Sequence, residues 1–304
     1  MGSDHSLVQY ERRLNEVLNH IDSHFDRALS LKDLANVAYF SEFHFHRIFR
    51  AYVGETPSGY LRRLRIQKSV ALLDQRPKIL LSRIAQDCGF SQSSDFTRAF
   101  KEVHGYPPSQ HRPGKIAEDS KIRQDILKNT GYSFGVESEQ LPGDVFEVGV
   151  ECLPEMRMGY LRVIGGFKPE KLMTALNRLL EWGRQSRLYP GARLICSSMD
   201  NPEVVPMAQY RTDLGIVLPP GSPEADGLSF RTIPAQRYAL LHCRGDYPKL
   251  YRAWSYLYAH WLPSSGYEPI DAPNLELYPS SHEENDWSAV DLHCCLPIQP
   301  LQTS

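Results

Sequence analysis

Apolar residues recur every three or four positions in two similar segments of the first 115 residues, and this spacing predicts helices. The first segment has its apolar stripe within residues 31–38, and the second has the matching stripe within residues 81–88. A polar turn and a second helical stripe follow each of them. The stripes consist of Leu31, Leu34, Ala35 and Ala38, and of Leu81, Ile84, Ala85 and Cys88.

These segments belong to an internal repeat of about 27 residues. The stretch LKDLANVAYFS (31–41) matches LSRIAQDCGFS (81–91), and FHRIF (45–49) matches FTRAF (96–100). A short helix, a tight turn and a second helix form a helix-turn-helix arrangement. The expected caps are serines at the helix starts and glycines after the second helices. They are Ser30 and Ser82, Ser41 and Ser91, and Gly54 and Gly105.

The second helix of each copy has one apolar and one polar face. At about 100° per residue, the apolar sets share one side and are expected to be buried: Phe45, Ile48, Phe49 and Tyr52, and Phe96, Ala99, Phe100 and Val103. The exposed sets carry Phe43, His46, Arg47 and Arg50, and Ser94, Thr97, Arg98 and Lys101. One polar face is most often only solvated, but two matched faces with an arginine at the same place favour DNA contact.

The histidines at positions 44 and 46 raise the alternative of a metal site. On a helix they point about 200° apart, so they cannot hold one ion as histidines four residues apart do. His44 is expected to pack at the edge of the core. A strand is disfavoured because the apolar set keeps helical spacing through Tyr52. We therefore predict no metal site and no cofactor.

A further helix over Tyr60–Leu73 lies between the two copies and carries both apolar and basic residues. Such a helix would hold the two units at a fixed separation. Two recognition helices about 34 Å apart can enter successive major grooves on one side of the duplex.

Residues 7–115 resemble the DNA-binding domain of the AraC/XylS family of bacterial regulators. The resemblance rests on FSEFHFHRIF (40–49), Gly54-x-x-Pro57, GFSQSSDFTRAFK (89–101) and Gly105-x-x-Pro108. It implies that bases are read by Phe43, His46 and Arg47, and by Ser93, Ser94, Thr97 and Arg98. Arg50 and Lys101 would neutralise phosphates. The alternative for each base-reading arginine is an internal ion pair with Asp95 or Glu42.

The second half of the chain has a different pattern. Residues 116–144 are polar and are interpreted as a linker with a helix over Ile122–Leu127. From Val145, strands alternate with helices in two similar copies, in which 156–167 matches 236–247. The predicted fold is multidomain: an all-α double helix-turn-helix domain, then an α+β domain built from a duplicated β-α-β-β unit. A curved antiparallel sheet with two helices on one side, and a cleft between the halves, is expected.

Residues 145–299 resemble the GyrI-like effector-binding domain. The shared features are Gly245-x-Tyr247, Trp261, Pro273-x-x-Glu276-x-Tyr278 and Leu296-Pro-Ile298. The resemblance implies that Glu276 pairs with a cationic ligand and that aromatic side chains surround it. The candidates are Tyr278, Trp182, Trp261, Tyr238, Phe167 and Tyr247. The alternative is that Glu276 pairs internally, for example with Arg237, and that the aromatic residues are ordinary core.

Charge and composition agree with this division. Residues 1–115 hold 17 Lys and Arg against 12 Asp and Glu, a net charge of +5, whereas the remainder has a net charge of −7. Neither a leader peptide nor a membrane span is indicated, and the six cysteines lack zinc-binding spacing, so we expect a cytoplasmic protein with reduced thiols.

The predicted function is sequence-specific transcriptional regulation controlled by a small, amphipathic, cationic effector. Promoter DNA and the effector are the expected partners, and RNA polymerase is a candidate partner. Two alternatives concern the second domain: a hydrolase that uses a cleft glutamate, or a module that binds another protein. No phosphate loop, Rossmann fingerprint or nucleophile elbow is present, and we predict that the protein is not an enzyme.

Overall fold

The computed structural model of the chain describes residues 2–75, 79–111, 145–165, 169–200, 205–222, 224, 227–279 and 289–301. Its contacts divide the chain into two compact units, Met1–Ser120 and Lys121–Ser304. The division falls inside the predicted linker, and the helix expected over Ile122–Leu127 lies outside the described residues. None of the helices in the described ranges has the length and apolar character of a membrane span.

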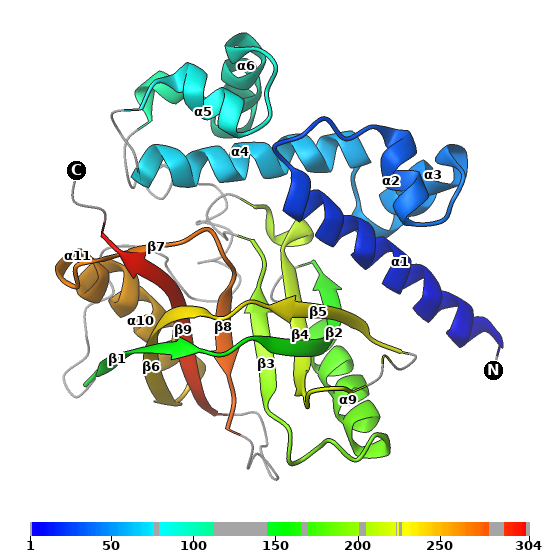
Figure 1. Cartoon of the computed structure of the whole chain (residues 1–304), viewed down its shortest axis with the longest axis vertical. Helices are drawn as coiled ribbons and strands as arrows, with labels where there is room; N and C mark the ends of the chain where they lie inside the picture. The colour runs from blue at the N-terminus through cyan, green and yellow to red at the C-terminus, as the bar shows by residue number, and fades with distance from the viewer. Residues whose placement is uncertain are drawn as a thin grey trace. The chain divides into compact units, whose positions relative to one another are not determined.

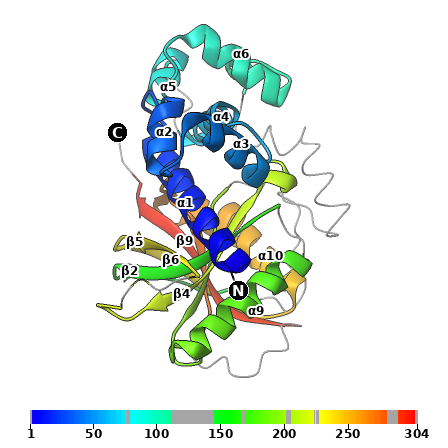
Figure 2. The same ribbon diagram turned by 90° about the vertical axis from the view of Figure 1, so that its right-hand side faces the viewer.

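The described part of the first unit is helical (Figure 1). Helices α2 and α3 form one helix-turn-helix unit, α5 and α6 form the other, and α4 runs between them, as predicted. Seen along the view of Figure 2, α3 and α6 lie on the same side of α4. The elements are α1 (Gly2–His24), α2 (Leu31–Val37), α3 (Glu42–Val53), α4 (Pro57–Gln75), α5 (Leu81–Asp87), α6 (Ser93–His104) and the 3₁₀ turn η1 (Pro108–Gln110).

The helix ends show why these segments fold where they do. Ser30 caps α2 in a capping box with Asp33, and Ser41 caps α3 by accepting from the backbone of His44. Gly54 and Gly105 end α3 and α6 with φ of 87° and 80°, a left-handed conformation that favours glycine.

The serine caps predicted in the second copy are wrong. Helix α5 begins after Leu80, which leaves Ser82 inside the helix. Helix α6 begins after Gln92 rather than after Ser91. Neither helix has a side-chain cap, so packing rather than capping fixes these two starts.

The core of the first unit is aromatic. The predicted apolar faces of α3 and α6 bury Phe45, Phe49, Phe96 and Phe100 completely, but Val103 is 46% exposed, contrary to expectation. Helix α1, which the sequence analysis did not predict, adds a buried stripe made of Leu14, Val17, Leu18 and Ile21.

The second unit is built on an antiparallel sheet of nine strands in the order β1-β6-β9-β8-β3-β4-β2-β5, with β7 paired to β9. The strands are β1 (Val148–Leu153), β2 (Met156–Ile164), β3 (Leu194–Ser198), β4 (Arg211–Leu218), β5 (Ser229–Ile233), β6 (Gln236–Gly245), β7 (Tyr267–Pro269), β8 (Asn274–Leu277) and β9 (Val290–Pro300). The helical segments are α9 (Pro169–Gln185), η2 (Met207–Gln209), α10 (Tyr247–Tyr256), the π-helical turn η3 (Leu257–Trp261) and α11 (Leu262–Ser264).

The order of the strands confirms the predicted duplication. One copy is β2-α9-β3-β4 and the other is β6-α10-β8-β9, and they meet where β3 pairs with β8. Strands β1 and β5 each precede one copy and pair with the first strand of the other, β6 and β2 respectively. This exchange ties the two halves together at both ends of the sheet.

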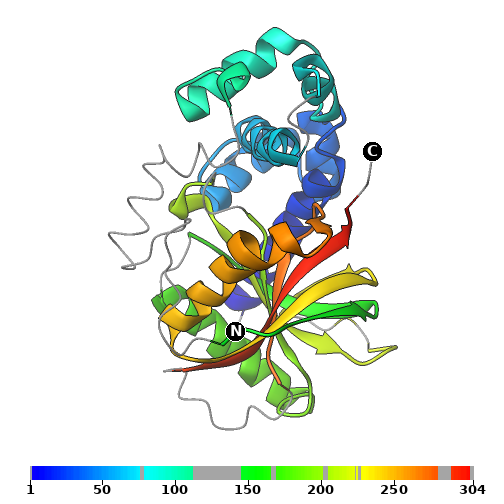
Figure 3. The same ribbon diagram turned by 90° about the vertical axis from the view of Figure 1, so that its left-hand side faces the viewer.

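Helices α9 and α10 lie on the same side of the sheet (Figure 2), and Figure 3 shows α10 crossing the sheet. Helix α10 packs on β6 and β9, and α9 packs on β2, β3 and β4. The other side has a separate core that includes Met158, Tyr160, Ile195, Leu275 and Leu277. Because side chains alternate along a strand, Glu276 between Leu275 and Leu277 faces the helices.

Candidate DNA-binding and ligand-binding sites

Helix α3 presents the side chains that the sequence analysis assigned to DNA. Phe43 is 67% exposed, Arg47 and Arg50 are exposed, and His46 is half-buried. The Arg47 guanidinium lies over the Phe43 ring, 5.7 Å from its centroid, which holds both groups near the N-terminal half of the helix. His44 is exposed, so its expected packing at the edge of the core is wrong.

Helix α6 presents a second face of the same kind. Ser93, Ser94, Arg98 and Lys101 are exposed, and the Thr97 hydroxyl donates to the Ser93 carbonyl oxygen at 2.8 Å.

The Arg98 guanidinium forms an ion pair with the Asp95 carboxylate at 2.8 Å, the internal pairing considered as the alternative. The Arg98 side chain is still 69% exposed, and an exposed ion pair contributes only about 0–1 kcal/mol. A phosphate or a guanine can therefore replace Asp95 at small cost.

His111 is the last described residue of this unit. Its side chain is almost fully buried, and its Nε2 lies 2.8 Å from an Asp74 carboxylate oxygen. The ring also stacks on Tyr106. Burial, and then the charge of His111, lower the pKa of the nearby His104 to about 4, so His104 is neutral in the folded protein near pH 7.

In the second unit, Glu276 lies at the centre of the helix-facing side of the sheet. The Trp254 indole Nε1 donates to its carboxylate at 3.1 Å, and the Cys196 thiol forms a second hydrogen bond with it. Burial raises the pKa of Glu276, and the two hydrogen bonds oppose this effect. Among the described residues no cation pairs with Glu276, so the pairing with Arg237 considered above does not form.

Two tyrosines lie within the electrostatic reach of this carboxylate. The pKa of Tyr278 and that of Tyr247 are both raised, first by burial and then by the charge of Glu276. Tyr278 also contacts the core clusters under both α9 and α10, which places it between the two helices. The structure thus brings Glu276, Tyr278 and Tyr247 together.

The remaining aromatic candidates are more scattered. Trp182 packs on the α9 cluster, and Trp261 stacks on Tyr267 with 6.1 Å between ring centroids. Tyr238 is fully buried on the opposite side of the sheet, so its predicted place beside Glu276 is wrong. Phe167 lies outside the described residues.

Sequence reasoning missed two direct neighbours of the carboxylate, Trp254 and Cys196. Cys196 lies directly opposite Glu276 where β3 pairs with β8. It also occupies the position equivalent to Glu276 in the other copy, 80 residues earlier, which is the offset of the repeat. The alignment of the two copies was the signal that could have identified it.

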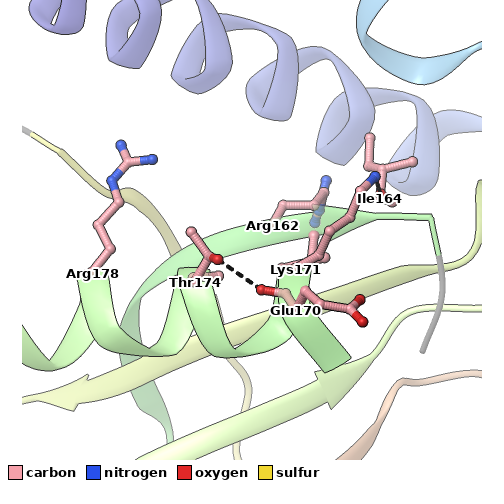
Figure 4. A pocket seen from close by; sticks show the side chains of 8 residues that line it. Arg162, Ile164, Glu170, Lys171, Thr174 and Arg178 are labelled. Atoms are coloured by element: carbon pink, nitrogen blue, oxygen red, sulfur yellow. Dashed lines mark hydrogen bonds between the residues drawn. The ribbon is translucent and has the colours of Figure 1, made fainter. Parts of the chain in front are cut away.

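A separate surface hollow of about 360 Å³ lies between β2 and the first half of α9 (Figure 4). It shares no residue with the candidate ligand site. Its lining carries mostly positive charge, which does not suit a cation, and consists of Arg162, Val163, Ile164, Glu170, Lys171, Thr174, Ala175 and Arg178. Within the described ranges no group of His, Cys, Asp and Glu side chains could hold a metal ion.

Comparisons with known proteins find a match for each of two parts of the chain. Residues 146–299 match the GyrI-like small molecule binding domain, and residues 34–113 match a helix-turn-helix domain. The probable transcriptional regulator LumQ of Photobacterium leiognathi is 36% identical over 102 residues, which are 33% of this chain and 41% of that protein. The chain thus spans about two fifths of the length of that relative.

Two further proteins resemble one unit each. A DNA gyrase inhibitor of Serratia proteamaculans is 28% identical over 152 residues, covering 48% of this chain and 95% of the inhibitor. A crystal structure of a transcriptional regulator with an AraC-type DNA-binding domain, from Chromobacterium violaceum, is 27% identical. It covers 32% of this chain and 85% of that chain, with a TM-score of 0.30.

Proposed function

The chain belongs to the GyrI-like small molecule binding family, and from this premise we propose that it is a sequence-specific transcriptional regulator controlled by a small cationic effector. The observation that carries the proposal is the pair of matched helices, α3 and α6. Each presents an arginine and further polar side chains on an exposed face. Two such faces in one compact helical unit suit the repeated major groove of a DNA duplex.

The proposed roles on DNA follow from side-chain chemistry. Arg47 and Arg98 each make bidentate contacts to guanine, which contribute about 1–3 kcal/mol of discrimination apiece. Phe43 contacts a thymine methyl group, and His46, Ser93, Ser94 and Thr97 bond to bases or phosphates. Arg50 and Lys101 bind phosphates, so the affinity falls steeply as salt rises.

The proposed effector is an aromatic cation that binds against Glu276. A buried carboxylate without a cation partner is costly, and a cationic ligand removes this cost. Tyr278 and Tyr247 supply aromatic faces that attract positive charge, and so does Trp254, which the structure places beside the carboxylate. Trp182 and Trp261 border the same side of the sheet, and an aromatic cation that is large enough contacts them too. The bound effector controls transcription if it binds the DNA-competent state with a different affinity.

In this role the protein catalyses no reaction and acts on DNA in the cytoplasm of a bacterium. Contact with RNA polymerase stays a prediction.

The experiment starts from DNA selected by the protein out of a random duplex pool. Its affinity is then measured by fluorescence anisotropy while a library of aromatic cations is added. The proposal predicts that one sequence is enriched and that a subset of cations changes its Kd. Failure to enrich any sequence, or turnover of a cation during the assay, would contradict it.

A further inference from the structure

Helix α2 ends in a backbone motif that usually requires glycine. The Tyr39 amide donates to the Asn36 carbonyl at 3.1 Å, and the Phe40 amide donates to the Ala35 carbonyl at 3.0 Å. This pair of bonds defines a Schellman motif, in which the residue after the cap adopts a left-handed conformation. That residue is Tyr39, with φ of 55°. A bulky side chain in this region is disfavoured because its Cβ crowds the following carbonyl.

Helix α5 ends in the same motif with the expected residue. The Gly89 amide donates to the Gln86 carbonyl, and the Phe90 amide donates to the Ala85 carbonyl, both at 2.9 Å. Gly89 has φ of 76°, and a Cβ there would lie 2.7 Å from the Asp26 carbonyl oxygen. The second copy therefore needs glycine, whereas the first copy adopts the same backbone with a tyrosine.

The strained Tyr39 gains little from its own protein. It is 80% exposed, the largest exposure among the exposed large apolar residues of the described chain. In the described ranges its phenol makes no hydrogen bond, and its ring contacts no other ring. A residue kept in a costly conformation, with its side chain in solvent, points to a role in contact with a partner.

The position of Tyr39 identifies that partner. Tyr39 lies two residues before Ser41, the cap of α3, and the exposed Phe43 follows in the first turn. In a helix-turn-helix unit the N-terminal residues of the second helix reach the base edges, and the flanking segments lie against the sugar-phosphate backbone. A tyrosine hydroxyl is a common donor to phosphate oxygens.

We propose that the Tyr39 hydroxyl donates a hydrogen bond to a DNA phosphate next to the major groove that α3 enters. The inference rests on the proposed DNA-binding function and extends it. Because Gly89 stands at the equivalent position, the second unit lacks this contact. The two helix-turn-helix units, although matched in their arginines, therefore hold the DNA backbone unequally.

Two substitutions separate this role from a structural one. Tyr39→Gly gives the motif its preferred residue, so the melting temperature of the protein should not fall. Tyr39→Phe keeps the ring and removes only the hydroxyl. Both variants should bind the selected DNA about fivefold more weakly, and bind mismatched sites more weakly by the same factor, because a phosphate contact carries no sequence information. The salt dependence should stay unchanged, since tyrosine is neutral.

Ethylation interference then locates the contact. One phosphate in the half-site of α3 should interfere with binding of the unmodified protein and stop interfering with Tyr39→Phe. Unchanged affinity of both variants overturns the inference, and so does a loss in Tyr39→Gly with none in Tyr39→Phe. Arg47→Ala, measured on the same DNA, separates a failure of the Tyr39 contact from a failure of the proposed DNA-binding function. If Arg47→Ala weakens binding and the Tyr39 variants do not, only the Tyr39 contact fails. If the unmodified protein selects no sequence, the proposed function itself fails.

Discussion

Both units of this protein contain an internal repeat, but the repeats differ in what they keep. In the helical unit, the two copies keep the same side chain at the key position, Arg47 and Arg98, and both are exposed. In the sheet unit, the equivalent positions hold different residues, Cys196 and Glu276, and these lie directly opposite each other. The helical repeat thus carries its charged side chain in both copies, and the sheet repeat carries its charged side chain in one copy only.

The physical reason lies in the expected partners. Duplex DNA repeats its grooves, so two equal contacts a helical turn apart can act together. A small molecule between the two halves of the sheet meets both copies at once. Directly opposite residues of paired strands lie about 5 Å apart, where two carboxylates would repel each other strongly. A neutral thiol opposite Glu276 avoids this repulsion and donates a hydrogen bond to the one charge.

The largest effect should come from removing that single charge. Glu276→Gln keeps the shape of the side chain, and we expect it to weaken binding of an aromatic cation such as N-methylquinolinium about 100-fold. Isothermal titration calorimetry measures the change. Cys196→Ala is the matched control and should cost less than threefold. Equal losses in the two variants would show that the carboxylate has no special role.

The affinity for the same cation should also depend on pH. Because burial raises the pKa of Glu276, the carboxyl is neutral at pH values where exposed glutamates are charged. Affinity is therefore full above the raised pKa and falls as pH decreases through it, by up to about tenfold per pH unit. Titrations between pH 4 and pH 8 test this expectation, and Glu276→Gln should give a flat profile. A flat profile for the unmodified protein would contradict the account.

A smaller and uniform effect is expected for Lys101 of the helical unit, which we propose binds a phosphate. Lys101→Ala should weaken binding to selected and unrelated duplexes alike, by about fivefold. The slope of log affinity against log salt should become shallower by about 1. Anisotropy titrations over a range of salt concentrations measure both. A loss confined to the selected sequence would instead make Lys101 a base-reading residue.

The smallest effect should be a gain. Asp95→Asn removes a negative charge from α6 and releases Arg98, so affinity for any duplex should rise about two- to threefold at low salt. Asp87→Asn, which breaks the exposed pair with Arg83 on α5, is a control outside α6. A weaker complex in Asp95→Asn would mean that Asp95 orients Arg98 for binding.

Sequence spacing predicted the elements that repeat, because both copies carry the same periodic pattern. It did not predict α1, which has a helical apolar stripe but no second copy. Strands β1 and β5 were also missed, since each pairs with the opposite copy and only a long-range pairing reveals their place.

The candidate sites show the same difference between local pattern and long-range pairing. The faces of α3 and α6 are set by local helical geometry, so Arg47, Arg98 and Lys101 could be assigned to the exposed faces from spacing alone, although His44 and Val103 were assigned wrongly. The surroundings of Glu276 depend on strand register and on which side of the sheet a residue faces. Tyr238 was therefore placed on the wrong side, and Trp254, contributed by another element, was overlooked.

The most direct test of the account is a footprint on the DNA that the protein selects. The account predicts two protected major-groove segments about 10 base pairs apart. Arg47→Ala should remove guanine protection in one segment, and Arg98→Ala should remove it in the other. A single protected segment, or two segments that respond alike to both substitutions, would contradict the account.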